Sequence, residues 1–294
     1  MNPTFETLIA GIVAGEAVSL PGVPAADYHA LPYASQSLLK EFADQPTPAH
    51  FKARKPKEQT EAMQFGTALH SLVLDRPMGT PYYLRPDEYP DAKKDGDKPV
   101  MKPWHGGASW CKDWLKNHSD RPVITSEEQA SLLAMRDSVL ALPVFAGLIE
   151  IGTPEISCFK RDAETDLVLK CRTDLIATDA NEVTWICDLK KVRLGGASET
   201  EFAKTCVDFG YHIQAAFYLD LTGASRFVFC AVEDEPPYAA NLIELDAEAV
   251  ALGRSAYRRA LQAYAACVAS GEWPGYAPGI KRVNLPAWAY KGQA

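Results

Sequence analysis

Apolar and polar positions alternate through most of the second half of the chain, and this alternation predicts a β-sheet. A period of two is typical of strands with one buried face. It predicts five strands, over residues 155–160, 167–177, 183–190, 226–232 and 240–245. A helix over residues 199–221 is expected between the third and fourth strands, and a long amphipathic helix over residues 246–269 after the fifth.

The first half of the chain has helical spacing instead. Phe65, Leu69, Leu72 and Val73 recur at that spacing and predict a helix over residues 60–74. Ser37 can cap a short helix over residues 38–44. Residues 81–103 are rich in Pro, Asp and Lys without periodicity, and they are expected to form a long loop. After them, Ser126-Glu127-Glu128-Gln129 has the form of a capping box, which predicts a helix that begins there and ends near residue 142. The first 35 residues show no helical pattern beyond about residue 17.

This order of elements favours an α/β core preceded by an α-helical N-terminal elaboration. Composition adds that the chain is globular, because 47% of its 294 residues are hydrophobic. Thirty Lys and Arg residues against 38 Asp and Glu residues give a net charge of −8. That balance argues against general affinity for polyanions, although it leaves room for a local basic groove.

Targeting and cysteine patterns point to the cytoplasm. No apolar run approaches the roughly 18 residues of a membrane span. The apolar stretch over residues 8–15 lacks the basic region of a signal peptide, since the first Lys or Arg is Lys40. The seven cysteines form no CxxC pair, so reduced thiols are expected rather than structural zinc or disulfides.

Charge is concentrated in the predicted hairpin over residues 167–190. Asp174 falls opposite residue 186 or 188 across the turn, and directly paired residues share a face, so Asp174 and Asp188 should project together. Lys190 follows on the same face, roughly 7 Å along. Two neighbouring carboxylates repel each other, and a divalent cation is the usual resolution. The alternative is a solvated hairpin with exposed ion pairs; the apolar residues before Asp188 favour a site at the end of an interior strand.

Three motifs in this half resemble the PD-(D/E)xK nuclease superfamily. They are Arg172-Thr173-Asp174-Leu175-Ile176, Asp188-Leu189-Lys190 and Gln214-Ala215-Ala216-Phe217-Tyr218. The third resembles the QxxxY motif of RecB-like and RecE-like exonucleases, and Phe65-Gly66-Thr67-Ala68-Leu69-His70 resembles their G-x-x-x-H motif. Thr173 stands where the superfamily name has Pro, and Asp188 where Glu is commoner; both keep the acids.

Three more segments look like the phage and prophage RecE (exonuclease VIII) nuclease domain. They are Ser35-Gln36-Ser37-Leu38-Leu39-Lys40, Pro48-Ala49-His50-Phe51 and Leu285-Pro286-Ala287-Trp288. The resemblance implies an N-terminal segment over residues 1–27 and one RecE-like nuclease domain over residues 28–294. Within that domain, residues 28–145 are expected to be mainly helical elaboration and residues 146–294 the catalytic core, a central mixed sheet with an antiparallel hairpin flanked by helices.

The resemblance assigns a role to each matching residue. Asp174 and Asp188 are expected to hold Mg²⁺, for which Mn²⁺ can substitute, with the Leu189 carbonyl contributing an oxygen. Lys190 would position or help deprotonate the attacking water. His70 is expected as a further metal ligand and Glu155 as a third acid, against the alternatives of a structural histidine and an ordinary strand charge. Gln214 and Tyr218, one turn apart, would contact DNA and orient the site, or else pack the helix.

For DNA contact, the sequence offers one acid-free basic segment near residue 50. Its candidate residues are Lys52, Arg54, Lys55 and Lys57, to which the resemblance adds Arg172. Lysines of residues 93–102 form a second patch, diluted by aspartates. Either can line a phosphate track, although charge runs are usually just solvated faces.

The resemblance implies a 5′ to 3′ exonuclease on linear double-stranded DNA that leaves 3′ overhangs for a RecT-like single-strand annealing protein. It also implies a homo-oligomer, with a ring around DNA, and no membrane partner. One alternative keeps the chemistry but makes the protein an endonuclease or a single-strand-specific nuclease. The other is a catalytically silent DNA-binding module, against which the intact Asp174, Asp188 and Lys190 argue.

Overall fold

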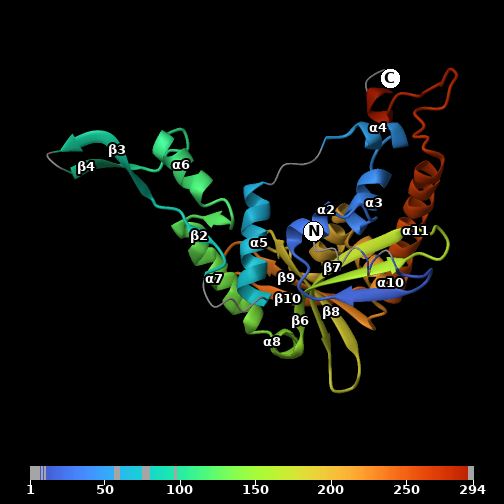
Figure 1. Ribbon diagram of the computed structural model, residues 1–294, viewed down its shortest axis with the longest axis horizontal. Coiled ribbons are helices and arrows are strands. Elements are labelled where there is room, and N and C mark those ends of the chain that lie inside the picture. Colours follow the sequence, from blue (N-terminus) through green and yellow to red (C-terminus); the bar gives the residue numbers. More distant parts are fainter. Residues whose placement is uncertain are drawn as a thin grey trace.

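A mixed six-stranded sheet in the order β1-β6-β7-β8-β9-β10 forms the centre of the protein (Figure 1). The computed structural model describes residues 7, 9, 11–55, 60–74, 80–95 and 98–290. The strands are β1 (Ala17–Leu20), β6 (Thr153–Arg161), β7 (Val168–Thr178), β8 (Thr184–Val192), β9 (Arg226–Glu233) and β10 (Ala240–Glu244). β8 and β9 are parallel and the other neighbours antiparallel. The predicted α/β fold with a mixed central sheet is therefore confirmed.

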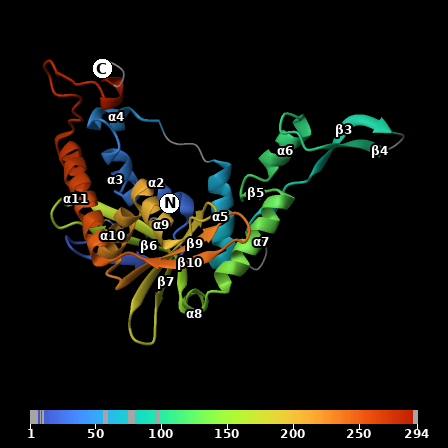
Figure 2. The same ribbon diagram turned by 180° about the vertical axis from the view of Figure 1, so that it is seen from behind.

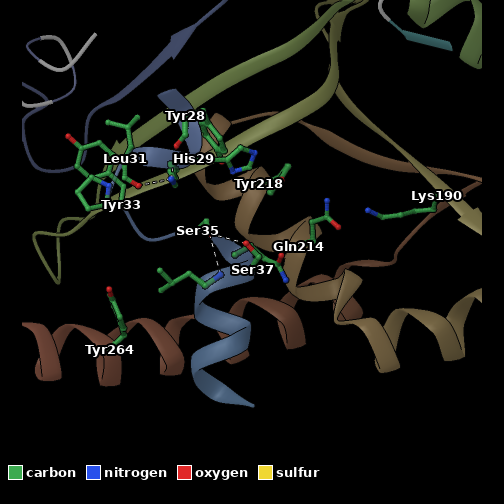
Figure 3. Close-up of a pocket in the computed structure, with 14 residues that line it drawn as sticks. Tyr28, His29, Leu31, Tyr33, Ser35, Ser37, Lys190, Gln214, Tyr218 and Tyr264 are labelled. Carbon is green, nitrogen blue, oxygen red and sulfur yellow. Dashed lines mark hydrogen bonds between the residues drawn. The ribbon is translucent and has the colours of Figure 1, made fainter. Parts of the chain in front are cut away.

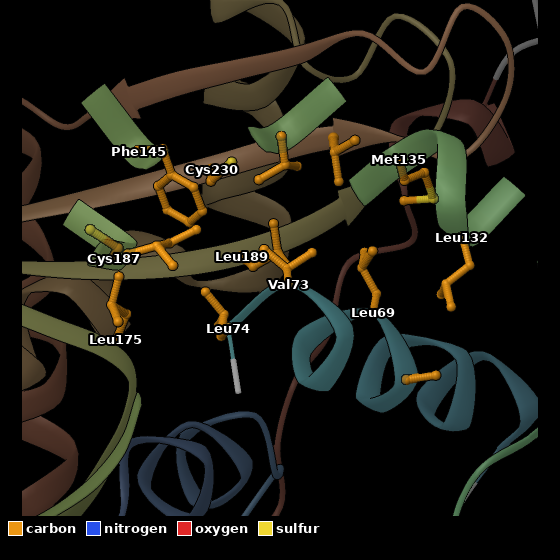
Figure 4. Close-up of a cluster of buried hydrophobic side chains, with 14 of the residues drawn as sticks. Leu69, Val73, Leu74, Leu132, Met135, Phe145, Leu175, Cys187, Leu189 and Cys230 are labelled. Carbon is orange, nitrogen blue, oxygen red and sulfur yellow. The ribbon is translucent and has the colours of Figure 1, made fainter. Parts of the chain in front are cut away.

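Helices cover both faces of this sheet. One face is packed by α5 (Glu61–Leu74), α7 (Ser126–Leu140) and α8 (Pro143–Ile151), and the other by α3 (Gln36–Ala43), α9 (Glu199–Phe209), α10 (Tyr211–Thr222) and α11 (Ala247–Ser270). The alternation along β8 makes this division: Cys187 and Leu189 pack against α5, α7 and α8 (Figure 4), whereas Ile186 packs against α9 and α10. Each face buries a separate apolar cluster, as the period of two requires.

The remaining elements decorate the core. They are α2 (Ala25–Ala30), α4 (Pro48–Ala53), β2 (Tyr83–Leu84), β3 (Glu88–Asp95), β4 (Lys98–Pro103), α6 (Ser109–Asn117), β5 (Val123–Ile124) and the short 3-10 helix η1 (Ala287–Tyr290). The β3–β4 hairpin and α6 project away from the sheet as an arm (Figure 2). Among the described residues no single helix has the length and apolar content of a membrane span; only α7 and α8, bent by 91° at their junction, meet both criteria as a pair.

The prediction of a long loop over residues 81–103 is wrong. This stretch contains β2 and the β3–β4 hairpin, and β2 pairs in parallel with β5. Every residue of β4 is exposed. A ribbon without a buried face imposes no apolar alternation on its sequence, so the pattern used to find strands was missing.

The helix predicted over residues 199–221 is also wrong, because it is two helices. Gly210 separates α9 from α10 in the left-handed conformation, with φ of 69°, and serves as the C-cap of the first and the N-cap of the second. Glycine adopts this conformation at no steric cost and commonly ends helices. The apolar period continues across the break, which is why the pattern predicted one element.

Two predictions nearer the N-terminus need adjustment. The sequence predicts no helix between about residue 17 and residue 35, but α2 lies there, and β1 before it pairs with β6 at the sheet edge. Residues 1–27 therefore contribute a strand to the sheet, and the domain boundary at residue 28 stays a prediction. The capping box lies one residue earlier than predicted: Thr125 is the N-cap of α7 and exchanges hydrogen bonds with Glu128.

Candidate active site

The β7–β8 hairpin brings the two predicted aspartates to the same place. Leu175 pairs with Cys187, and continuing this register by one residue puts Asp174 opposite Asp188. The regular ladder stops at that pair, and instead Asp174 Oδ2 accepts a hydrogen bond of 3.0 Å from the Leu189 amide. A side chain thus replaces a backbone partner where the two strands separate, and it fixes the Asp174 carboxylate against β8.

Asp188 is the most deeply buried member of the site, with 2% of its surface exposed. Its Oδ1 accepts a 2.5 Å hydrogen bond from Gln214 Nε2 on α10. Its Oδ2 lies 2.7 Å from Lys190 Nζ, in an ion pair whose angles do not suit a hydrogen bond. Among the described residues this buried oxygen therefore has no hydrogen-bond donor. Burial, reinforced by the charge of Asp174, raises the pKa of Asp188 despite the nearby ammonium.

Lys190 is held between acids and an aromatic ring. Its Nζ lies 4.7 Å from the ring centroid of Tyr211 and 2.7 Å from Asp188 Oδ2. Burial alone would lower the pKa of Lys190, but Asp188 and Asp174 outweigh burial and raise it. The ammonium is therefore a positive charge held in a largely buried position, where it can stabilise a phosphoryl oxygen.

His70 lies between Asp174 and β8 and joins α5 to the hairpin. Its Nδ1 is 3.2 Å from Asp174 Oδ2, and its Nε2 is 2.9 Å from the Leu189 carbonyl oxygen. Both partners are acceptors, so both ring nitrogens must donate, and only the imidazolium does this. Burial lowers the pKa of His70, yet the Asp174 carboxylate more than compensates and raises it to about 9.

The glycine of the G-x-x-x-H motif, Gly66, makes no close backbone contact in the described part of the chain. A side chain at Gly66 would meet no atom within 4 Å among the described residues, so the helix does not approach another backbone there. What brings His70 to β8 is apolar packing of the adjoining positions of α5, where Leu69 and Val73 are buried in the same cluster as Leu189 (Figure 4).

Glu155 lies on β6, where the β6–β7 register puts it opposite Asp174, and its role as a third acid stays a prediction. It adopts a positive φ of 55° on β6 and is skipped in the β6–β7 ladder. Its carboxylate forms an ion pair with Arg172 at 3.3 Å, and its side chain is 48% exposed. Arg172 also donates to Ser157 Oγ and to the Val23 carbonyl. The structure thus gives Arg172 internal partners that tie the N-terminal segment to the sheet, and a contact of this residue with DNA stays a prediction.

The basic segment near residue 50 also has partners within the chain. Arg54 forms a 2.9 Å ion pair with Glu41, and its guanidinium lies over the Phe51 ring. Lys52 lies over the ring of Trp273. Lys55 is exposed, while Lys57 lies outside the described residues. A phosphate track along this segment stays a prediction.

A cavity of about 610 Å³ opens beside the catalytic candidates (Figure 3). Lys190, Gln214 and Tyr218 line its inner end, and residues 28–38 line much of the remainder. Lys170, for which the sequence predicted no role, also lines this cavity. Its ammonium donates hydrogen bonds to the carbonyls of Tyr28 and Leu31 at 2.8 and 2.7 Å. In the sequence, Lys170 alternates with apolar residues on the same side of its strand as Arg172 and Asp174, and this was the available signal. Burial, with Arg172 nearby, lowers the pKa of Lys170 to about 8.

The donor set fits a hard divalent cation. In the described part of the chain, no three His, Cys, Asp or Glu side chains form a preformed metal cluster. Mg²⁺, however, is usually bound by one or two carboxylates with waters and substrate phosphates completing the shell. Asp174, Asp188 and the Leu189 carbonyl supply such oxygens, and the Asp188 oxygen without a donor is one that a cation would satisfy.

Comparison with known proteins bears on the fold and the family of this chain. No curated protein matches the chain. The crystal structure of a "putative exonuclease" from Eubacterium rectale aligns with a TM-score of 0.53 and 12% identity, covering 92% of this chain and 99% of that chain. At this identity it supports the fold alone. A second solved structure, of the protein SSO0001, covers 47% of this chain and 63% of that chain at 16% identity, and its TM-score of 0.28 carries no argument.

The sequence itself matches a family model over residues 35–285. That range includes β6 to β10 together with His70, Asp174, Asp188, Lys190 and Gln214. The resemblance to the PD-(D/E)xK nuclease superfamily is thereby confirmed, while assignment to its RecE-like branch stays a prediction. The chain belongs to the family described as "PDDEXK-like domain of unknown function (DUF3799)".

Proposed function

We propose that this protein is a Mg²⁺-dependent exonuclease that digests linear double-stranded DNA from 5′ to 3′ and leaves 3′ single-stranded overhangs. The observation that carries the nuclease part is the convergence of Asp174, Asp188 and Lys190 at the middle of β8, with Gln214 bound to the buried carboxylate. Acids that face each other across a hairpin beside a fixed ammonium match the needs of phosphodiester hydrolysis.

The cavity beside the site favours a polyanionic substrate. The residues that line it include Lys170 and Lys190 but no Asp or Glu, in a chain whose net charge is −8. Serine, glutamine and tyrosine side chains supply further hydrogen-bonding groups at its wall. A basic, polar cavity that ends at the catalytic lysine suits a nucleic acid strand whose phosphates pass along it.

Each residue has a defined task in this proposal. Asp174 and Asp188, with the Leu189 carbonyl, would hold the cation; Gln214 fixes the orientation of Asp188 by its 2.5 Å hydrogen bond. Lys190 binds a phosphoryl oxygen and stabilises the charge that builds on it. When bound, the cation supplies Lewis-acid stabilisation and activates water for the attack.

The test is hydrolysis of end-labelled linear duplex with Mg²⁺ by the wild type and by Asp188→Asn, which keeps the shape of a side chain that is 2% exposed. We expect the variant to lose hydrolysis and keep DNA binding. Asp234→Asn is the matched control, because Asp234 pairs with Lys191 on the other side of β8. EDTA should abolish wild-type activity, and Mg²⁺ or Mn²⁺ should restore it. Equal activity in Asp188→Asn contradicts the assigned site.

The same assay separates the alternatives. An exonuclease leaves a closed circular duplex intact, an endonuclease cuts it, and a single-strand-specific nuclease spares linear duplex. Release of label from the 5′ end before the 3′ end supports the proposed direction. No nucleotide release with Mg²⁺ and retained DNA binding would establish a catalytically silent DNA-binding module instead.

The proposed partners are a second copy of the chain and a RecT-like annealing protein. A homo-oligomer, in the form of a ring around the duplex, would reconcile the acidic net charge with tight retention of DNA. Light scattering of the purified protein tests the oligomer. Co-elution with the annealing protein tests the second partner.

A further inference from the structure

An exposed aromatic ring stands directly beside the candidate active site. Phe209, the last residue of α9, is 59% exposed. Single exposed apolar residues are common on protein surfaces, so exposure alone indicates no role. The packing of the Phe209 ring does indicate a role, because the ring stacks on Tyr211, which in turn contacts the catalytic lysine.

Phe209 is the outermost of three stacked rings. Its ring lies 5.8 Å from that of Tyr211 at an interplanar angle of 23°, and Tyr211 lies 5.6 Å from the buried Phe229 at 28°. The middle ring is also the one that Lys190 Nζ approaches to 4.7 Å. The stack therefore runs from the sheet, past the catalytic ammonium, to solvent.

The backbone around Phe209 is fixed from two sides. Gly210 breaks the chain direction between α9 and α10, which turns the last side chain of α9 toward the first of α10. Lys40 on α3 donates a 2.8 Å hydrogen bond to the Phe209 carbonyl, and its aliphatic chain lies 3.3 Å from where a Gly210 Cβ would be. A ring held in this way loses little conformational freedom when a ligand stacks on it.

We infer that Phe209 stacks on an unpaired nucleobase of the strand whose phosphate is bound at Lys190, so that the ring holds the separated end of the substrate. This rests on the proposed function, since it places nucleic acid in the site. The ring stacks on Tyr211 while 59% of Phe209 stays exposed, which is the arrangement of a stacking platform. The distances of 5.8 and 4.7 Å put the ring within a few base steps of about 3.4 Å from the ammonium.

A stacking contact with Phe209 would bind any nucleobase and would not select a particular DNA sequence. Every nucleobase has a flat π-face, so stacking tolerates any sequence, as digestion of arbitrary DNA requires. The ring adds no hydrogen-bonding group that would read a base edge. Lys190 and the cavity supply the charge for the phosphates, and Phe209 supplies the apolar surface for the base.

The experiment combines a protein change with a DNA change. Affinity for a short duplex with a frayed end is measured by fluorescence anisotropy, with Ca²⁺ in place of Mg²⁺, for the wild type, Phe209→Ala, Phe209→Leu and Phe209→Trp. Each protein is also tested on duplexes in which a single abasic site replaces one of the first four nucleotides from either end. Val207→Ala is the control, because Val207 is 70% exposed on the same helix but outside the stack.

Phe209→Ala and Phe209→Leu should weaken binding of intact DNA by about 5- to 150-fold, the range for loss of one base–aromatic stack, while Phe209→Trp restores it. At one abasic position the wild type should weaken equally, and Phe209→Ala should weaken it no further, because ring and base are then partners in one interaction. Additive effects at every position, or a loss of affinity that accompanies a changed oligomeric state on size exclusion, overturn the inference.

Failure of the proposed function has a different signature. If the wild type hydrolyses no nucleic acid with Mg²⁺ but Phe209 and one base remain coupled in binding, the nuclease proposal fails and the stacking inference stands. If the wild type hydrolyses DNA but Phe209 shows no coupling to any base, the nuclease proposal stands and the stacking inference fails.

Discussion

A methyl group added at Gly253 probes how closely α10 and α11 must pack to hold the site. The new Cβ would lie 2.0 Å from the His212 carbonyl oxygen and 2.9 Å from the Ile213 nitrogen. Both are backbone atoms of α10, so no side-chain rotation relieves the overlap. Because real Cβ contacts do not fall below 3.0 Å, the two helices must separate by about 1 Å.

This overlap gives both a stability and an activity prediction for Gly253→Ala. Overpacking of a fixed core costs about 1–3 kcal/mol, and occasionally more, whereas alanine gains about 1 kcal/mol over glycine in a helix. Rigid backbone on both sides puts the clash at the upper end, so we expect a net loss of about 2 kcal/mol in the free energy of unfolding. Displacement of α10 also lengthens the 2.5 Å hydrogen bond from Gln214 to Asp188, so hydrolysis should fall in protein that is still folded.

Urea unfolding followed by tryptophan fluorescence, together with nucleotide release at low urea, measures both effects. Gly147→Ala is the control, since Gly147 lies inside α8 and a Cβ there meets nothing within 4 Å among the described residues. That change should leave hydrolysis intact and raise stability by up to about 1 kcal/mol. Wild-type stability in Gly253→Ala would refute the close packing, and lost stability with unchanged hydrolysis would refute the link through Gln214.

Three further predictions concern charged residues. Lys190→Ala should abolish hydrolysis, whereas Lys191→Ala, which removes the half-exposed ion pair with Asp234, should keep it and cost less than about 1 kcal/mol in unfolding experiments. Burial raises the pKa of Asp162, but hydrogen bonds from Arg258 and Thr165 outweigh burial and lower this pKa below the usual carboxyl value of 3.8. The stability that the Asp162 carboxylate contributes is therefore fully present above pH 3.8 and is lost as the pH falls through the pKa of Asp162 in the folded protein. The stability difference between wild type and Asp162→Asn should accordingly shrink below about pH 4 in urea unfolding across pH, and a constant difference contradicts this assignment. DNA affinity should fall as the pH rises through the Lys170 pKa of about 8, and Lys170→Met should flatten that profile in an anisotropy titration.

The sequence predicted the β7–β8 hairpin correctly because its determinants are local. The apolar alternation and the turn together decide which residues of β7 and β8 share a face, and a shift of one residue would bury the charged set in the wrong layer. Asp174 and Asp188 therefore meet as expected. Prediction failed where the backbone conformation does not change the apolar pattern. Gly210 separates two helices although the apolar period continues through it. Glu155 has a positive φ although it is not a glycine, so the sequence gives no sign of that conformation.

Tertiary contacts account for the other differences. No periodicity can tell that Lys170 binds the carbonyls of Tyr28 and Leu31, or that Arg172 binds the Val23 carbonyl, because those partners are about 140 residues distant in the chain. The same holds for Arg54, whose partner Glu41 lies on a different helix. The sequence alone therefore cannot show which basic residues already bind acids and carbonyls within the chain.

The site can be read as one strand to which each neighbouring element adds a residue. β8 carries Asp188 and Lys190; β7 adds Asp174, α5 adds His70 and α10 adds Gln214. Alternation along β8 turns Leu189 the other way, into the apolar cluster that holds α5, while its amide and carbonyl still bind Asp174 and His70. The buried leucine between the two charged residues thus couples core packing to the chemistry. Loss of apolar contact under α5 should consequently disturb His70 and Asp174 before it unfolds the sheet.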